Sequence, residues 1–411
     1  MRASTYLILA TTVVFVSTRV AADTTFRRPW STSLTVDETY DSNLYLQSST
    51  PLAERASWVT SISASFELAT PQNLERGATL AYSPGWTHVH SASTEDFVVH
   101  RFSTGARLPL AGAAVSAQLS ATITDGADEG IVWTGPGGPP ATGAPAVRDR
   151  RDQSIYRGAV RAEWKNEYST LRASGTLYWA DFQTALRHTS GYQNYVDRGD
   201  FSLGVDALRT LAPKFHAGAG LRLGRQEQAR VLGFPEDYDN QYVRLLALAE
   251  GPVSRWLSVA LAVGPEFRHY GPRVHPTFAD RSITNLFIDA AVSVAATRRD
   301  AIALVVREFQ QMSSSGRGAF DDRNFDLAWR HTFTQRASGA LVLHAYNTRF
   351  LRPALRDDWV HTARLQGTFA WTENWTLDAS LLLEEGSSDV PRMAGREYIR
   401  QVVSLSLRTR F

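Results

Sequence analysis

Apolar and polar residues alternate with a period of two along most of the chain. Trp58, Ile62 and Phe66 occupy even positions of one such stretch, whereas Ser63 and Glu67 lie between them. Because successive side chains of a β-strand point to opposite faces, this alternation predicts strands with one apolar and one polar face. The spacing of an amphipathic helix fits none of these stretches.

The alternation predicts strands along the chain from about residue 31 onward, and we count 18 of them. An even number is expected when both ends of a barrel lie on the same side of a membrane. A count of 16 is the alternative, because the stretches near Trp86 and Tyr195 alternate least clearly. The predicted strands are 31–40, 56–69, 78–87, 96–107, 113–125, 154–164, 169–182, 195–209, 214–227, 240–250, 255–268, 282–296, 300–311, 322–333, 338–349, 358–371, 375–385 and 397–411.

The connections between these segments alternate between short and long. The longest, near 126–153, is rich in Gly and Pro, and we interpret it as an extracellular loop rather than a linker, because strand alternation resumes beyond it. Tight turns at one rim and long loops at the other are typical of outer-membrane barrels. The predicted fold is all-β: a transmembrane antiparallel up-and-down β-barrel, built by one domain over 23–411.

The first 22 residues have the pattern of a signal peptide. Arg2 is followed by an apolar run from Tyr6 to Val16, and Ala21 and Ala22 provide small residues at a cleavage point. A spanning helix needs about 20 apolar residues, and this run is shorter. Together with the barrel pattern, the leader predicts the outer membrane of a Gram-negative bacterium.

The chain ends on a strand with apolar residues at Val403, Leu405, Leu407 and Phe411. This ending resembles the C-terminal signal of bacterial outer-membrane barrels, which implies that Phe411 is read by the barrel-assembly machinery. Aromatic girdles at the membrane interfaces are a further expectation for such a barrel. Tryptophans near the ends of predicted strands fit that expectation, namely Trp58, Trp164, Trp179, Trp256, Trp359, Trp371 and Trp375.

The segment from Glu38 to Leu46, Glu-Thr-Tyr-Asp-Ser-Asn-Leu-Tyr-Leu, follows the first alternating stretch. It resembles the segment that opens many outer-membrane β-barrel porins of the group called beta-barrel porin 2. The resemblance covers the whole chain in architecture, and in motif only this segment and the C-terminus. It implies a channel, and because some members of the group accompany exopolysaccharide-export systems, it also implies possible periplasmic export partners.

Composition narrows the chemistry further. The chain has no cysteine, which excludes disulfides, a cysteine nucleophile and thiolate metal sites. A formal net charge of +2 with scattered arginines gives no reason to expect a nucleic-acid partner. The expected surroundings are instead outer-membrane lipid and lipopolysaccharide.

Motifs for enzymatic chemistry are weak, and we expect no catalytic residues, metal site or cofactor. His88 and His90 share one strand face and could reach a metal ion, but two ligands do not make a site, and a wet rim position is the preferred interpretation. The acidic run from Glu236 to Asn240 could bind calcium, although solvated loop acids are the simpler interpretation. The glycines between Gly218 and Gly224 do not have dinucleotide-binding spacing, and small residues facing a lumen explain them better.

Arginines at polar positions of the strands are the expected lining of the barrel. Placing an arginine on the lipid face near the midplane would cost roughly 2 to 4 kcal/mol, so these side chains should face inward. The same parity rule places fewer acidic residues than arginines on the inner face: Asp37, Glu67, Glu163, Glu266, Asp289, Asp326, Asp378 and Glu384. The arginines are Arg101, Arg107, Arg157, Arg161, Arg172, Arg222, Arg244, Arg268, Arg307, Arg330, Arg364, Arg400 and Arg408.

The excess of inward arginines predicts a cationic lumen, although opposed charges could instead pair into a network that stiffens the wall. The leading functional hypothesis is a porin-like channel for small anionic or sugar-like solutes. The second is an outer-membrane component of an exopolysaccharide export or assembly system. The third, an outer-membrane hydrolase, is disfavoured because no serine–histidine or carboxylate site can be assembled.

Overall fold

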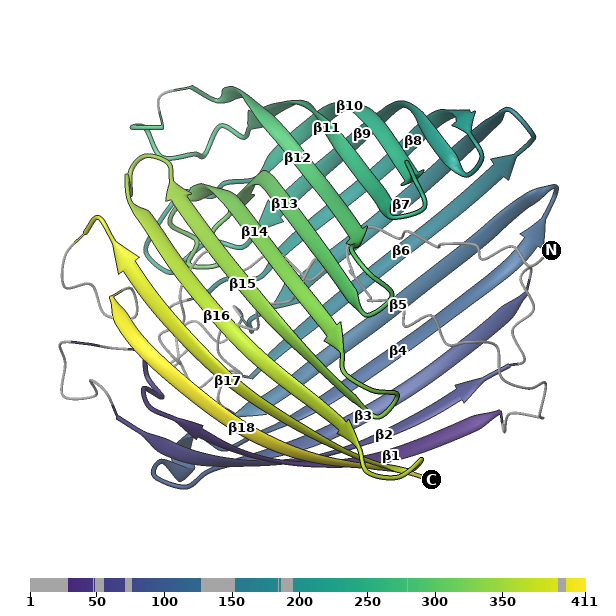
Figure 1. Ribbon diagram of the computed structural model, residues 1–411. Coiled ribbons are helices and arrows are strands. Elements are labelled where there is room, and N and C mark those ends of the chain that lie inside the picture. The colour runs from purple at the N-terminus through teal and green to yellow at the C-terminus, as the bar shows by residue number, and fades with distance from the viewer. Residues whose placement is uncertain are drawn as a thin grey trace.

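The computed structural model describes residues 29–46, 48, 55–70, 76–126, 152–183, 185, 195–278, 280–390 and 397–411. The predicted signal peptide and nearly all of the predicted loop at 126–153 lie outside them. Eighteen strands form a single antiparallel sheet, and the pairing of β1 with β18 closes it into a barrel (Figure 1). This confirms the fold class and the strand count of 18.

The strands follow one another around the barrel in chain order. Their bounds are β1 Trp30–Asp41, β2 Ser57–Ala69, β3 Gly77–Val89, β4 Phe97–Leu110, β5 Ala113–Gly126, β6 Gln153–Lys165, β7 Ser169–Asp181, β8 Arg198–Ala212, β9 Phe215–Gln228, β10 Asn240–Pro252, β11 Leu257–Tyr270, β12 Ser282–Ala295, β13 Asp300–Met312, β14 Ala319–Thr332, β15 Ala337–Phe350, β16 Asp357–Ala370, β17 Trp375–Ser388 and β18 Tyr398–Arg410. A short 3-10 helix, η1 Ser93–Glu95, lies between β3 and β4.

Short turns and long connections alternate as predicted, so the barrel has a short-turn rim and a long-loop rim. The turn between β4 and β5 consists of Ala111 and Gly112, with φ angles of 49° and 78°. Positive φ at both central residues is the geometry that matches the twist of a two-residue hairpin. β1 begins and β18 ends at this same rim, since Ser33 pairs with Arg410.

Large apolar side chains cover the outside of the wall. Leu203, Leu365 and Leu405 are 69%, 57% and 54% exposed, and each lies on the apolar parity of its strand. Soluble monomers rarely expose contiguous apolar patches larger than a few hundred Å². An apolar belt around a closed barrel with a polar interior is the arrangement of a transmembrane β-barrel.

Exposed tryptophans gather near the rims, as an interfacial girdle requires. Trp164, Trp256, Trp371 and Trp375 lie at the short-turn rim, and Trp58 lies near the long-loop rim. Trp179 and Trp359 are nearer the long-loop rim and only partly exposed. Among the described residues, no helix is long and apolar enough to cross a membrane.

One hairpin departs from the regular wall. The ladder between β12 and β13 ends at the pair of Ile288 with Glu308, whereas β13 continues to Met312 alongside β14 (Figure 1). We call residues 309–320 the hairpin tip. Inward-facing side chains of β8, β9 and β11 donate hydrogen bonds to its backbone carbonyls, so the tip lies inside the barrel. The bonds run from Arg198 to Met312, from Gln228 to Ser313 and from Arg268 to Gln310.

Candidate functional site

The inner wall carries the predicted arginines. In β9, Leu221 and Leu223 are 39% and 50% exposed on the outside, and Arg222 lies between them with the opposite orientation. The same parity argument places each predicted arginine on the inner side of its strand. These residues are Arg101 and Arg107 on β4, Arg157 and Arg161 on β6, Arg172 on β7, Arg222 on β9, Arg244 on β10, Arg268 on β11, Arg307 on β13, Arg330 on β14, Arg364 on β16, and Arg400 and Arg408 on β18.

Many of these arginines are paired with carboxylates on neighbouring strands. Arg172 is the centre of one group, with Nη2 2.6 Å from Glu250, Nη1 3.2 Å from Asp206 and Nε 3.5 Å from Glu163. Arg222 donates to the other oxygen of the same Asp206 at 2.5 Å. Further pairs join Arg161 to Glu163, Arg307 to Asp289, Arg400 to Asp41 and Glu384, and Arg408 to Asp378.

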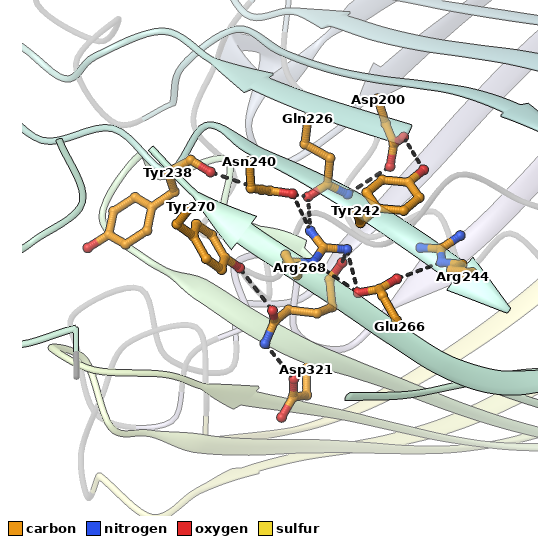
Figure 2. A network of polar contacts seen from close by, with 11 residues as sticks. Asp200, Gln226, Tyr238, Asn240, Tyr242, Arg244, Glu266, Arg268, Tyr270 and Asp321 are labelled. Carbon is orange, nitrogen blue, oxygen red and sulfur yellow. Dashed lines mark hydrogen bonds and ion pairs between the residues drawn. The ribbon is translucent and has the colours of Figure 1, made fainter. Parts of the chain in front are cut away.

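Figure 2 shows a second group, in which Gln226, Asn240, Arg244 and Glu266 surround Arg268; we call it the Arg268 network. The Arg268 side chain is fully buried, and its Nη2 lies 2.8 Å from Glu266 Oε1. Arg244 donates from Nε to the other oxygen of Glu266 at 2.5 Å. One Nη of Arg268 also donates to Asn240 Oδ1 at 2.8 Å and to Gln226 Oε1. The buried charges of Arg268 and Glu266 therefore balance each other, and amide acceptors take further guanidinium hydrogens.

The Arg268 network extends to Asp200 on β8, and the ring of Tyr242 packs against its arginines. Tyr242 donates from its hydroxyl to Asp200 at 2.8 Å, and Gln226 donates to the second oxygen of that carboxylate at 2.7 Å. The guanidinium carbons of Arg244 and Arg268 lie 4.2 and 5.0 Å from the Tyr242 ring centroid. Gly224 on β9 leaves room for this ring, because a Cβ there would overlap it.

The Arg268 network also holds the hairpin tip through Gln310. Arg268 donates to the backbone carbonyl of Gln310 at 2.9 Å, and Tyr270 donates to its side-chain oxygen at 3.0 Å. Gln310 in turn donates to Asp321 on β14 at 3.1 Å. The network thus connects the wall at β8–β11 with the strands that bend into the lumen.

Tyr238 lies beside this network in the connection between β9 and β10. It is 1% exposed and packs in an apolar cluster with Tyr270, Phe278, Met312 and Ala319. Burial raises the pKa of Tyr238 to about 12, and repulsion by Glu236 adds to the shift. The phenol therefore stays neutral across the physiological range.

A third group contains arginines that form no ion pair with any described residue. Arg157 and Arg198 approach the ring of Tyr178, with guanidinium carbons 5.8 and 5.6 Å from its centroid. In the described part of the chain, neither forms an ion pair with a carboxylate. Nε of Arg157, and Nε and Nη2 of Arg198, are buried without a hydrogen-bond partner there. Oxygen atoms of a ligand that reached these buried donors would supply the hydrogen-bond acceptors that they lack.

The inner wall is more nearly neutral than predicted. Several inward acids were missing from the predicted set, and so was Arg198, although the parity rule that found Arg172 would have included all of them. The predicted general excess of positive charge is therefore wrong, because the added acids nearly balance the inward arginines. The added acids are Asp41, Asp200, Asp206, Glu250, Asp322 and Asp358.

The candidate metal motifs form no larger cluster: within the described residues, no group of three or more potential ligands gathers. His88 pairs with Asp96 at 2.8 Å, and His90 lies 3.9 Å from Glu38. The prediction of solvated acids at Glu236–Asn240 is wrong for Asp237. This carboxylate is 3% exposed and forms an ion pair with Arg273 at 2.5 Å.

Fold and inner wall together define the class: a transmembrane β-barrel with an apolar exterior and a charged, partly filled interior. No family model matches the chain, and no curated protein matches it. Solved structures that it resembles include OccK2 (OpdF) of Pseudomonas aeruginosa, with 12% identity, 93% of this chain and 98% of that chain covered, and a TM-score of 0.48. OccAB3 of Acinetobacter baumannii is 10% identical, with 93% of this chain and 99% of that chain covered and a TM-score of 0.47. A BenF-like porin from Pseudomonas fluorescens Pf-5 is 9% identical, with 94% of this chain and 100% of that chain covered and a TM-score of 0.47.

At such low identities and scores, these comparisons do not identify a solute for this chain. The barrel architecture implied by the resemblance to the beta-barrel porin 2 group is observed in the structure itself.

Proposed function

We propose that this chain is a porin-like channel in the outer membrane of a Gram-negative bacterium, through which small solutes diffuse. The observation that carries the proposal is the closed 18-stranded wall, with an apolar outer belt and a charged inner face. Barrels of 16 to 18 strands leave an aqueous channel, unlike 8-stranded barrels, whose interior is filled by side chains. Lipid and lipopolysaccharide would surround the outer belt.

The preferred solutes are small anions, including carboxylates, and sugar-like molecules. Arg157, Tyr178 and Arg198 support this preference, because two guanidinium groups that form no ion pair with the described residues approach one aromatic ring. A carboxylate or a sugar hydroxyl would supply the missing acceptor oxygens, and the ring would supply a flat contact surface. The paired groups around Arg172 and Arg268 stiffen the wall and add little net attraction.

The polysaccharide-export hypothesis rests on the resemblance alone. It would require periplasmic partners, and the inward hairpin tip would have to leave the path of a polymer. The hydrolase hypothesis stays disfavoured, since no constellation described above supplies a nucleophile with its base.

Single-channel recording of refolded protein in planar bilayers tests the channel. We expect stepwise conductance increases, and a heat-unfolded sample of the same preparation is the control. Silence over many insertions of correctly folded barrel would overturn the proposal. A reversal potential measured under a salt gradient then reports whether anions are preferred.

A further inference from the structure

The boundary between β12 and β13, which we call the seam, is only partly paired. Near the long-loop rim, the facing edges of the two strands do not form backbone hydrogen bonds with each other. β12 pairs with β11 as far as Ser282, but its pairing with β13 stops at Ile288. β13 pairs with β14 as far as Met312, but its pairing with β12 stops at Glu308. Residues 282–287 of one strand and 309–312 of the other therefore each have an edge that the sheet does not use.

Side chains of the inner wall donate hydrogen bonds to the backbone of the hairpin tip, in place of the backbone hydrogen bonds that β12 would otherwise make. The carbonyl of Gln310 accepts from Arg268 at 2.9 Å, and the carbonyl of Met312 accepts from Arg198 at 2.7 Å. Gln310 has the same parity as Ile302 and Leu304, which are exposed on the outside of the barrel. At Gln310 the side of β13 that would face lipid instead contacts the inner wall. The end of β13 therefore lies inside the barrel, on the lumen side of β11 and β12.

Contacts across the lumen complete this inward position. The carbonyl of Ser314 accepts from the backbone nitrogen of Val196 at 2.8 Å. Met312 packs against Tyr238 and Tyr270 in the apolar cluster. Because Arg198 bonds to the tip and is 3% exposed, the inward tip also covers one of the two guanidiniums beside Tyr178.

The two unused edges match each other. Continuing the register of Ile288 with Glu308 would bring Phe287 opposite Phe309 and Asn285 opposite Gln311. The two phenylalanine rings already lie 6.5 Å apart. The side-chain nitrogen of Asn285 is buried with no hydrogen-bond partner in the described residues, and an opposing glutamine could supply one.

We propose that the hairpin tip is a gate with two positions, one in the lumen and one in the wall. In the lumen position it narrows the channel and covers Arg198. In the wall position it pairs with β12, widens the channel and exposes Arg198 to the solute. The gate rests on the proposed channel function and adds a regulated element to it. Unpaired strand edges are costly in a membrane, so completing the ladder offsets the hydrogen bonds that the tip gives up when it leaves the lumen.

Paired cysteines test the gate, because the chain has no cysteine of its own. Val196→Cys with Ser314→Cys should lock the lumen position, and Asn285→Cys with Gln311→Cys should lock the wall position. Ala295→Cys with Ala301→Cys is the control, since these residues pair in the part of the seam that stays closed. Crosslinks are read by gel mobility with and without reductant, and conductance is recorded on the same samples.

We expect all three crosslinks to form. The lumen lock should remove the high-conductance level, the wall lock should remove the low-conductance level, and reductant should restore both. The control should conduct as the unmodified protein does. Two results would refute the two-position gate. In one, the cysteines at 285 and 311 stay reduced while the control pair oxidises; in the other, the two crosslinked variants have the same conductance. Silence of every variant would overturn the channel and the gate together, while the crosslinks would still report whether the tip reaches the wall.

Discussion

Charged side chains on the inner wall differ in whether a neighbour balances their charge. Arg268 is fully buried against Glu266, and Arg222 is bound to Asp206, whereas Arg157 and Arg364 have no carboxylate in ion-pair contact within the described chain. Balanced arginines contribute to the integrity of the wall, and unbalanced ones to its electrostatic potential. Substitutions of the two kinds should therefore separate stability from selectivity.

The Arg268→Met substitution should strongly destabilise the folded barrel. It leaves the buried Glu266 with one arginine fewer, and removing one partner of a buried ion pair typically costs about 3 to 5 kcal/mol. Arg225→Met is the matched control, because Arg225 and Glu227 form an exposed pair at 2.9 Å, where a loss below about 1 kcal/mol is expected. Heat-dependent gel mobility and urea unfolding measure both variants. Equal unfolding midpoints would argue against a stabilising role of the Arg268 network.

The double substitution Arg157→Gln with Arg364→Gln should reduce anion preference and leave the folded yield unchanged. In the unmodified channel, this preference should weaken with salt, because the Debye length falls from about 10 Å at 0.1 M to about 3 Å at 1 M. Reversal potentials under a salt gradient measure the change.

Its counterpart, Arg161→Gln with Arg222→Gln, removes arginines bound to Glu163 and Asp206. This variant should lower the unfolding temperature and shift selectivity less. The reverse outcome, in which the second variant changes selectivity and the first changes stability, would contradict the division between balanced and unbalanced arginines.

At the scale of elements, β18 closes the barrel by pairing with both β17 and β1. Val403, Leu405 and Leu407 face outward, and the last residue, Phe411, is 67% exposed at the short-turn rim. Its backbone nitrogen donates to the carbonyl of Thr32 at 3.0 Å, a bond that any residue could make. The phenyl ring therefore adds little to the stability of the folded wall.

The Phe411→Ala substitution should slow assembly and leave more unfolded protein in the periplasm, because the ring is expected to be read by the assembly machinery. Even complete burial of such a side chain is worth only about 1.5 to 3 kcal/mol, and here most of the ring is exposed. Leu110→Ala is the control, since Leu110 is 66% exposed near the same rim. Pulse-chase measurement of the heat-modifiable form follows assembly. If both variants assemble at the rate of the unmodified protein, the terminal aromatic is incidental.

At the scale of the whole molecule, the two rims predict an orientation. The short turns should face the periplasm, and the long connections should face the outside of the cell. Two positions that sequence alone would select as outside probes, Tyr238 and Gly316, are buried in the structure and are unsuitable. Ser387 and Arg298 are exposed and lie at opposite rims.

A membrane-impermeant thiol reagent on intact cells should label Ser387→Cys and leave Arg298→Cys unlabelled. After the outer membrane is permeabilised, both should react, which controls for the reactivity of Arg298→Cys. Labelling of Arg298→Cys on intact cells, with Ser387→Cys protected, would show that the barrel has the opposite orientation.

The sequence by itself determined the strands, favoured 18 of them over 16, and determined the rim at which each turn lies and the side of the wall that each predicted arginine faces. These properties are local, because alternation depends only on which neighbouring residues prefer lipid and which prefer water. Strand boundaries agree within a few residues, even around Trp86, where alternation was weak. Near Tyr195 the prediction began too early, because Val196 bonds to Ser314 across the lumen instead of joining the sheet.

Only the tertiary structure decided which inner charges meet and where the hairpin tip lies. Arg172 reaches Glu163, Asp206 and Glu250 because the strand register brings four strands to one height, and no local pattern encodes that height. The inward position of the tip depends on Arg198 and Arg268, which are distant in sequence from the carbonyls they bind. Alternation distinguishes the two sides of a strand, but contacts inside the barrel depend on the curvature and closure of the complete wall.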